Sequence, residues 1–251
     1  MLTPAALAIL GITIPATSFL SGIFGMAGGI VLLAVLLAFL DVAPAMVLFG
    51  ATQFAANGWR VVLWREHVQW KLVAEFMVTA VITFVILKWI SLVPNKAVVY
   101  IGLGVLPFIA RALPRSLTPD ITRPGAAYLC GAVITFLNLV TGVGGAILDT
   151  FYQMSGLDRR AVVATKAAKQ SMGHLMRIFY FGTLTVVGEG GLPLWTYGAA
   201  IVLAMIGTTL AARVLENMSN ESFRRWSWRV ISTISLISLF RGVYLIATGA
   251  A

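Results

Sequence analysis

The sequence predicts an all-α polytopic membrane protein made of two inverted-topology repeats of about five hydrophobic segments each. Hydrophobic residues make up 59% of the 251 positions and charged residues only 11%, about half the charged share of a typical soluble domain. So few charges cannot cover a body of this size, and the bilayer must therefore be its main solvent. Two further observations support this fold: apolar runs long enough to cross a membrane, and a resemblance between the two halves of the chain.

About 20 helical residues are needed to cross about 30 Å of hydrocarbon. By this measure the chain divides into ten successive hydrophobic segments. Two of them are short and lie beside glycine clusters. This combination predicts a broken or re-entrant helix, which the bilayer tolerates only where protein or water satisfies the free backbone groups. In chain order the segments cover 4–23, 28–40 (short), 43–64, 71–91, 95–112, 124–140, 145–156 (short), 160–182, 193–214 and 225–248.

The two halves match without a gap at an offset of 117 residues. Because five segments per half is an odd number, the second half must be inverted in the membrane, as in alternating-access transporters. We therefore expect a first transmembrane repeat over 1–112, a cytoplasmic linker over 113–123 and a second transmembrane repeat over 124–251. The offset pairs Phe19 with Phe136, Gly25 with Gly142, Gly28 with Gly145, Gln53 with Gln170 and Arg60 with Arg177.

The excess of 18 Lys+Arg over 9 Asp+Glu predicts the orientation. Basic residues gather in alternate connections, which the positive-inside rule places in the cytoplasm. Both termini then lie outside, and we expect the protein in the cytoplasmic (inner) membrane. The basic residues lie between apolar runs and not on one polar face with aromatics, which argues against nucleic acid as a partner. The predicted cytoplasmic residues include Arg65, Lys71, Arg111, Arg115, Arg123, Arg159, Arg160, Arg213, Arg224, Arg225 and Arg229.

The segment 160–182 carries the strongest functional signal, a set of polar side chains within an arc of roughly 140° on one helical face. Charges well inside a membrane helix need a partner, water or a ligand. Lys166 and Lys169 have an alternative role, because they lie near the segment start and can reach the cytoplasmic headgroups. The residues on this face are Lys166, Lys169, Gln170, Gly173, His174 and Arg177.

The equivalent segment of the first half offers Gln53, Asn57 and Arg60 on one face. Two polar faces related by the repeat would meet near the middle of the membrane and line a cavity. The planar fork of arginine suits two oxygens of a sulfonate, sulfite or carboxylate, so we expect a small anion as the substrate. The alternative for Arg60 and Arg177 is structural: a pair with Asp149, or a bond to a helix C-terminal carbonyl.

Both glycine clusters favour anion binding. A helix that begins just after such a cluster points free N–H groups and its positive dipole end into the site. The alternative is that these glycines allow close helix packing. No Gly-Lys-Ser/Thr follows either cluster, so neither is a phosphate-binding P-loop. The expected site residues are Gly25, Gly28 and Gly29 in the first cluster and Gly142, Gly144 and Gly145 in the second.

Titratable groups are scarce within the apolar segments. We expect Asp149 and His174 to couple transport to protons, with the alternative that His174 only lines the cavity as a donor. Cys130 is the single cysteine, so an intramolecular disulfide or cysteine metal cluster is impossible. The sequence shows no paired carboxylates, Ser/His/Asp arrangement or metal-ligand cluster, so we expect no catalysis, no cofactor and no metal.

Two glycine-rich motifs, each followed by a short apolar segment and an alanine-rich helix, make this sequence resemble the sulfite exporter TauE/SafE family of membrane permeases. The resemblance covers nearly the whole chain and depends on the duplication of the motif. It implies transport of sulfur-containing anions such as sulfite, thiosulfate or organosulfonates. Among the expected site residues, the family motif corresponds to the six glycines named above. The chain departs from the family pattern at Ala27, which interrupts the first cluster, and at Ala146, which ends the second.

The sequence thus predicts a secondary transporter that moves a small, sulfur-containing anion by alternating access around a central site. The membrane potential or a proton gradient would drive it, because the chain has no ATP-binding motif. Its expected partners are the small anion, the lipid bilayer and protons. A passive anion channel is the alternative within transport, and a membrane-embedded enzyme that uses His174 and Asp149 is the alternative from another class.

Overall fold

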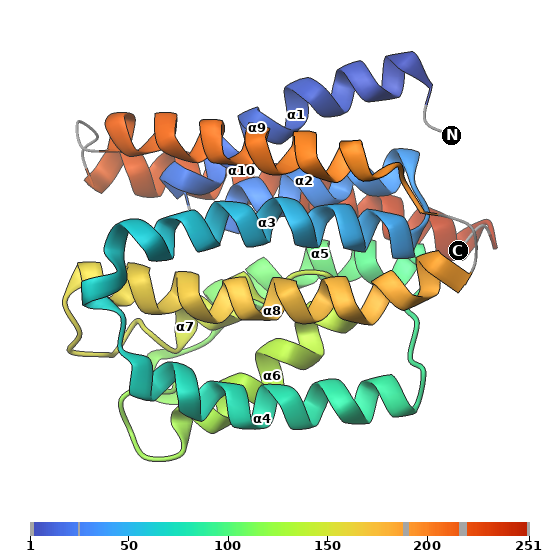
Figure 1. Cartoon of the computed structure of the whole chain (residues 1–251). Coiled ribbons are helices and arrows are strands. Elements are labelled where there is room, and N and C mark those ends of the chain that lie inside the picture. The colour runs from blue at the N-terminus through green and yellow to red at the C-terminus, as the bar shows by residue number, and fades with distance from the viewer. Residues whose placement is uncertain (1–2, 25, 188–190, 216–219, 250–251) are drawn as a thin grey trace.

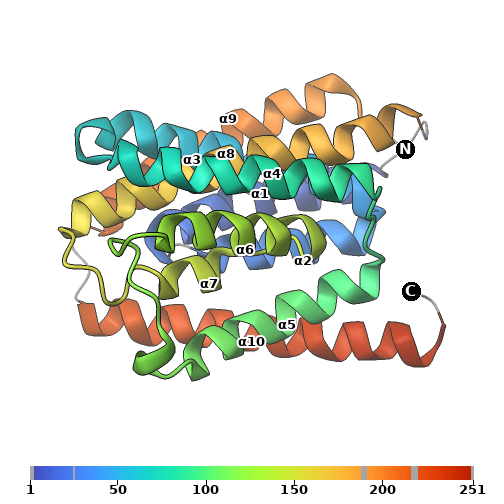
Figure 2. The same cartoon turned by 90° about the horizontal axis from the view of Figure 1, so that it is seen from below.

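The structure, a computed structural model, describes residues 3–24, 26–187, 191–215 and 220–249. This part of the chain is helical and contains no strand, which confirms the all-α prediction. The long helices lie side by side in one bundle, and both termini lie at the same end of it (Figures 1 and 2). The elements are α1 (Pro4–Phe24), α2 (Met26–Phe39), α3 (Val42–Trp64), η1 (Arg65–His67), α4 (Trp70–Trp89), α5 (Lys96–Ala112), η2 (Arg115–Leu117), α6 (Ala126–Val140), α7 (Gly145–Thr150), α8 (Arg159–Val187), α9 (Leu194–Leu215) and α10 (Asn220–Ala247).

The two segments beside the glycine clusters are short helices, but their bounds differ from the prediction. α2 begins at Met26, so its two glycines lie inside its first turn and not before it. α7 has only six residues and ends at Thr150, well before the predicted end of 145–156. Beyond Thr150 three successive amides bond to carbonyls three residues back, at 3.1 to 3.3 Å. This tighter winding ends the α-helix.

Among the described residues, four helices are long and apolar enough to cross a membrane, and they expose much of their apolar surface. On α4, for example, Ile82 is 53% exposed and Trp89 is 85% exposed. α2 is different, because Leu32, Leu33 and Leu36 are fully buried at the centre of the bundle. Exposed apolar surface of this extent needs lipid around it, so the chain is an integral membrane protein. The four spans are Pro4–Ile23, Trp70–Trp89, Leu194–Ala211 and Trp228–Ala247.

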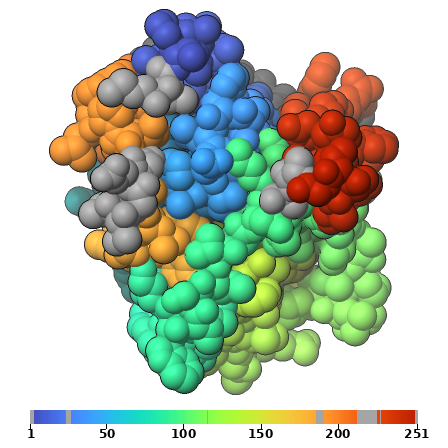
Figure 3. All heavy atoms as spheres, turned by 90° about the vertical axis from the view of Figure 1, so that its right-hand side faces the viewer, coloured from blue at the N-terminus to red at the C-terminus, as the bar shows by residue number. Residues whose placement is uncertain are grey.

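Each half of the chain packs mainly against the other half. α1 packs on α9, α3 on α8, α4 on α6 and α5 on α10. Two of these contacts are close: a Cβ on Gly207 would lie 2.3 Å from the Pro15 carbonyl oxygen, and one on Gly131 would lie 2.1 Å from that of Phe76. Small residues at helix contacts stabilise membrane bundles, where lipid is as apolar as the side chains. In the end-on view of Figure 3, the light-blue region where α2 meets α3 lies between orange second-half helices and the red α10.

Helix α5 contains an internal proline, Pro107. Proline has no amide hydrogen, so the carbonyl of Leu103, one turn earlier, has no helical partner. Ser235 of α10 is fully buried and its hydroxyl donates to that carbonyl oxygen at 3.2 Å. α5 is therefore bonded to α10 at the break in its own hydrogen-bond ladder.

Candidate functional site

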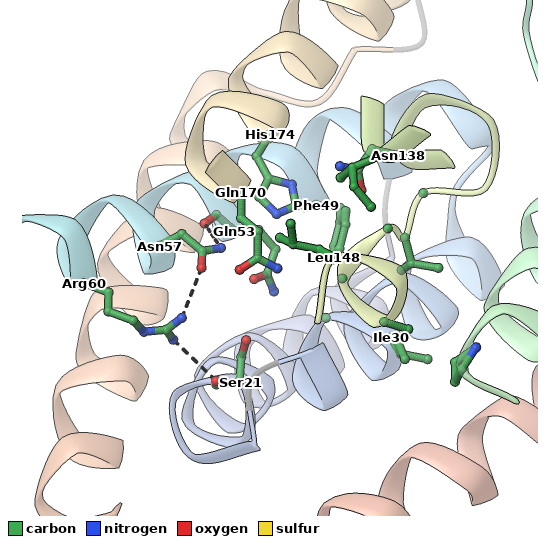
Figure 4. A pocket seen from close by; sticks show the side chains of 18 residues that line it. Ser21, Ile30, Phe49, Gln53, Asn57, Arg60, Asn138, Leu148, Gln170 and His174 are labelled. Carbon is green, nitrogen blue, oxygen red and sulfur yellow. Dashed lines mark hydrogen bonds between the residues drawn. The ribbon is translucent and has the colours of Figure 1, made fainter. Parts of the chain in front are cut away.

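A cavity of about 600 Å³, its open side included, lies where the two halves of the chain meet. Its walls come from α1, α2, α3 and α5 of the first half and from α6, α7 and α8 of the second (Figure 4). None of the described lining residues is an Asp or a Glu. The lining consists of Ser21, Gly29, Ile30, Phe49, Gln53, Asn57, Arg60, Pro107, Ile134, Asn138, Gly142, Val143, Gly144, Gly145, Ala146, Leu148, Gln170 and His174.

The α3 wall carries the three polar residues predicted for the first half. Gln53, Asn57 and Arg60 are spaced by four and three residues, so they share one helical face. The Asn57 amide donates to the Gln53 carbonyl at 2.9 Å, and Arg60 Nη1 donates to Asn57 Oδ1 at 3.1 Å. Arg60 Nη2 donates to the Ser21 carbonyl of α1 at 3.4 Å, so the guanidinium bridges two helices at the edge of the cavity (Figure 4). The Gln53 Nε2 is buried without a hydrogen-bond partner, and it is free to donate to a ligand.

The α8 wall presents Gln170 and His174 to the cavity, and Arg177 lies behind them. Arg177 is fully buried and is not a lining residue. Its Nη2 donates at 2.7 Å to each of two carbonyls, those of Asn138 and Gly142. Its Nη1 lies 3.0 Å from His174 Nδ1. A guanidinium can only donate, so Nδ1 accepts and the ring proton of His174 must reside on Nε2.

Sequence reasoning missed two lining residues that complete these networks, Ser21 and Asn138. Arg60 bonds to the carbonyl of Ser21, and Arg177 bonds to the carbonyl of Asn138. The two acceptors are 117 residues apart, as the two arginines are. The offset that paired the arginines could therefore have found the acceptors, although Ser and Asn are not identical. Phe49, which also lines the cavity, gave no polar signal and was not predicted.

Four of the six predicted glycines line the cavity. Gly142 has a φ of 78°, and a Cβ there would lie 2.2 Å from the side chain of Leu33. Backbone in this region, with a neighbour this close, requires glycine. The lining glycines are Gly29, Gly142, Gly144 and Gly145.

The other two predicted glycines are not part of the described lining. Gly28 faces α1, where a Cβ would lie 1.9 Å from the Thr17 carbonyl oxygen. Its role in the structure is therefore a close helix contact, the alternative that the sequence left open. Gly25 lies outside the described residues.

Three charged residues of α7 and α8 lie away from the cavity. Lys169 is 1% exposed, so the alternative that it reaches the headgroups is wrong. Asp149 forms an ion pair with Lys166. It does not pair with Arg177, which bonds to backbone carbonyls. The wide polar face of α8 is therefore divided between the cavity and a second environment.

One family model covers the whole cavity. The model of the sulfite exporter TauE/SafE family matches residues 9–239. The chain belongs to this family. The match confirms the family predicted from the glycine motifs and makes the protein a membrane transporter. No curated protein and no solved structure matches the chain significantly.

The lining of this TauE/SafE cavity suits a ligand with negatively charged oxygens. Arg60, Gln53 Nε2 and the His174 Nε2–H can all donate, and the described lining holds no carboxylate to oppose an anion. Within the described residues no group of three His, Cys, Asp or Glu side chains could hold a metal ion. The described chain thus offers hydrogen-bond donors and positive charge at the cavity.

Proposed function

We propose that this protein is a secondary transporter that moves a small sulfur-containing anion, such as sulfite, thiosulfate or an organosulfonate, across the cytoplasmic membrane. One observation carries the proposal: in a TauE/SafE chain, donors from both halves line a cavity between α3 and α8 that has an arginine and no described carboxylate. An anion in such a cavity offsets the cost of holding positive charge inside the membrane.

In the proposed complex Arg60 contacts the anion directly. Arg60 as a whole residue is only partly buried, and the bond from its guanidinium to the Ser21 carbonyl is long, at 3.4 Å. A planar guanidinium binds two oxygens of a sulfite or sulfonate at once. Gln53, Asn57, Gln170 and His174 complete the binding set with neutral polar groups. Arg177 adds its positive charge from behind the wall and makes no direct contact.

We infer an alternating-access mechanism in which two inverted repeats, 1–112 and 124–251, move against each other around this site. Matching bonds support the repeats: Arg60 and Arg177 each bond to the residue three positions earlier and to a carbonyl 39 positions earlier. Packing supports them as well, because α1 on α9 and α6 on α4 are equivalent pairs at the 117-residue offset. In this arrangement the linker over 113–123 is cytoplasmic and both termini are outside.

A proton gradient is the proposed driving force, with Asp149 as the first candidate for the coupling group and His174 as the second. Asp149 is partly exposed and its ion pair with Lys166 joins α7 to α8, so its protonation would release one short helix from the wall. Protonation of His174 on Nδ1 would break its bond to Arg177, which makes His174 the less favourable carrier.

Uptake into proteoliposomes tests the proposal. The measurement compares sulfite, thiosulfate and sulfoacetate, with and without a pH gradient, in wild type, Arg60→Ala and Arg177→Ala. We expect saturable uptake by wild type and loss of most of it in both variants. Arg111→Ala is the matched control, because Arg111 is exposed and lies over the Trp228 ring, 3.9 Å from its centre, away from the cavity lining.

Three results would contradict the proposal. Normal uptake by folded Arg60→Ala and Arg177→Ala protein would make the arginines structural. Flux that does not saturate and ignores the gradient would indicate a passive channel. A chemically altered product would indicate an enzyme.

A further inference from the structure

Lys169 of α8 is a buried cation without a polar partner. Its side chain is 1% exposed, and its Nζ makes no hydrogen bond. None of the described carboxylates lies within salt-bridge distance of it. Two aromatic rings face it, with Nζ 5.3 Å from the centre of Phe76 and 5.4 Å from that of Tyr152. Cation–π contacts offset only part of the cost of burying an ammonium group.

A second unpartnered donor belongs to Tyr152, whose ring centre is 5.4 Å from this ammonium. The Tyr152 hydroxyl is buried and has no hydrogen-bond partner either, although buried hydroxyls nearly always have one. The other titratable groups near Lys169 are Cys130 of α6, which is buried, and Glu75 of α4, which is partly exposed. An ammonium and a hydroxyl, both lacking an acceptor, are suited to the oxygens of a small anion.

One wall, built from Leu148 of α7 and Ile134 of α6, is shared between the central cavity and the apolar cluster around these two donors. Leu148 of α7 lines the cavity, and it also packs in the apolar cluster that contains Phe76, Cys130 and Tyr152. Gln170, the next residue after Lys169 and about 100° further around the same helix, lines the cavity.

α7 also extends from the cavity towards the surface of the bundle. The ion pair of Lys166 with Asp149 lies at its outer edge, where these side chains are 21% and 33% exposed. Between His174 and Lys166 α8 rises about 12 Å, and Lys169 lies between them. α7 has six residues and is followed by tight turns, so it can shift without disrupting a long helix.

We propose that Lys169 and Tyr152 form a second anion-binding subsite, which receives the sulfur oxyanion from the central cavity as it passes α7. The subsite rests on the proposed function, since its ligand is the transported anion. The anion would give the ammonium a directly bonded counter-ion and the hydroxyl an acceptor, two contacts that both groups lack in the described chain. Entry requires α7 to move, and this makes the Lys166–Asp149 ion pair the outer boundary of the subsite.

Two measurements on the purified full chain test the subsite. The first is equilibrium binding of ³⁵S-labelled sulfite and thiosulfate in detergent. The second is exchange of the same anions across proteoliposomes that have no pH gradient. We expect Lys169→Met to bind with a Kd within about threefold of wild type, because the central cavity is intact, and to exchange at least about tenfold more slowly. Tyr152→Phe, which removes one hydroxyl, should slow exchange about threefold.

The controls separate this inference from the proposed function. Lys88→Met removes another lysine of a membrane helix, one that bonds to Tyr180 and Thr183 away from the cavity, and should exchange at the wild-type rate. Arg60→Gln should lose binding itself. Wild-type protein that binds none of these anions refutes the proposed function and the subsite with it.

Other outcomes overturn the subsite alone. Wild-type exchange by folded Lys169→Met would make the lysine structural. Wild-type exchange combined with loss of gradient-driven accumulation would make it a proton carrier. If Lys169→Met does not fold, Tyr152→Phe decides, because wild-type exchange in that variant contradicts a site with two donors.

Discussion

Arg60 and Arg177 occupy equivalent positions in the two halves, yet their surroundings differ. Arg60 is partly exposed at the cavity and makes two bonds, at 3.1 and 3.4 Å. Arg177 is fully buried and makes four, two of them at 2.7 Å. One of its acceptors, the Gly142 carbonyl, belongs to the glycine-containing turn that precedes α7. In the proposed function this difference separates two roles: Arg60 binds the anion, and Arg177 holds the cavity wall in place.

The largest expected effect is that of Arg177→Ala. It leaves the Asn138 and Gly142 carbonyls without their donor, and each unsatisfied buried group costs about 1–3 kcal/mol. We expect the protein to lose about 2–6 kcal/mol of stability, together with nearly all uptake. Thermal melting followed by size-exclusion chromatography would detect the first effect. A variant that melts and transports like wild type would show that Arg177 does not hold the turn.

Lysine substitutions sharpen the comparison. Arg60→Lys keeps a positive charge at the cavity and loses the planar fork of the guanidinium. We expect it to retain about a tenth to a third of wild-type uptake, with most of the loss caused by a higher KM, and to melt at the wild-type temperature. Arg177→Lys cannot reach its separate acceptors with one ammonium group, and we expect it to resemble Arg177→Ala. Equal behaviour of the two lysine variants would remove the proposed distinction.

Asp149→Asn tests a feature that only the second half has. The positions equivalent to Asp149 and Lys166 in the first half are Leu32 and Phe49. The ion pair is partly exposed, so its loss should change stability by about 1 kcal/mol or less. We expect anion exchange to persist and accumulation driven by a pH gradient to disappear. Intact accumulation would exclude Asp149 as the coupling group.

The smallest effect is expected for His174→Asn, which makes the second network resemble the Asn57 network of the first. Asparagine still offers an oxygen to Arg177, so we expect uptake within about threefold of wild type and an unchanged response to the pH gradient. Uptake measured between pH 6 and pH 8 checks this. A lost gradient response would transfer the coupling role from Asp149 to His174.

The sequence predicts the fold well because long apolar runs and their connections leave few choices in a membrane. It also predicts the polar residues of both cavity walls, Gln53, Asn57 and Arg60 of α3 and Gln170 and His174 of α8, because each set shares a helical face, although Arg177 of the second set lies behind the wall. The acceptors Ser21 and Asn138 were accessible through the same offset that paired the arginines. These features are local or repeated, and that is why one sequence contains enough information for them.

Other features depend on neighbours that the sequence does not reveal. A polar arc of roughly 140° on α8 is wide enough to contact more than one neighbouring helix, so Gln170 faces the cavity and Lys169 faces aromatic rings of α4 and of the turn after α7. The burial of Arg177 depends on a carbonyl from the Gly142 turn. The early end of α7 follows from turn hydrogen bonds in a run that is apolar enough for a longer helix.

The bond from Ser235 to the Leu103 carbonyl makes two distant positions energetically interdependent. With Pro107 present, Ser235→Ala leaves the buried Leu103 carbonyl without a hydrogen-bond donor. With alanine at 107, the restored backbone amide can take over that carbonyl and the serine becomes dispensable. A double-mutant cycle should therefore give strongly non-additive stabilities. Ser235→Ala alone therefore carries a penalty that the joint substitution with Pro107→Ala avoids, so the need for a polar residue on α10 depends on the proline of α5.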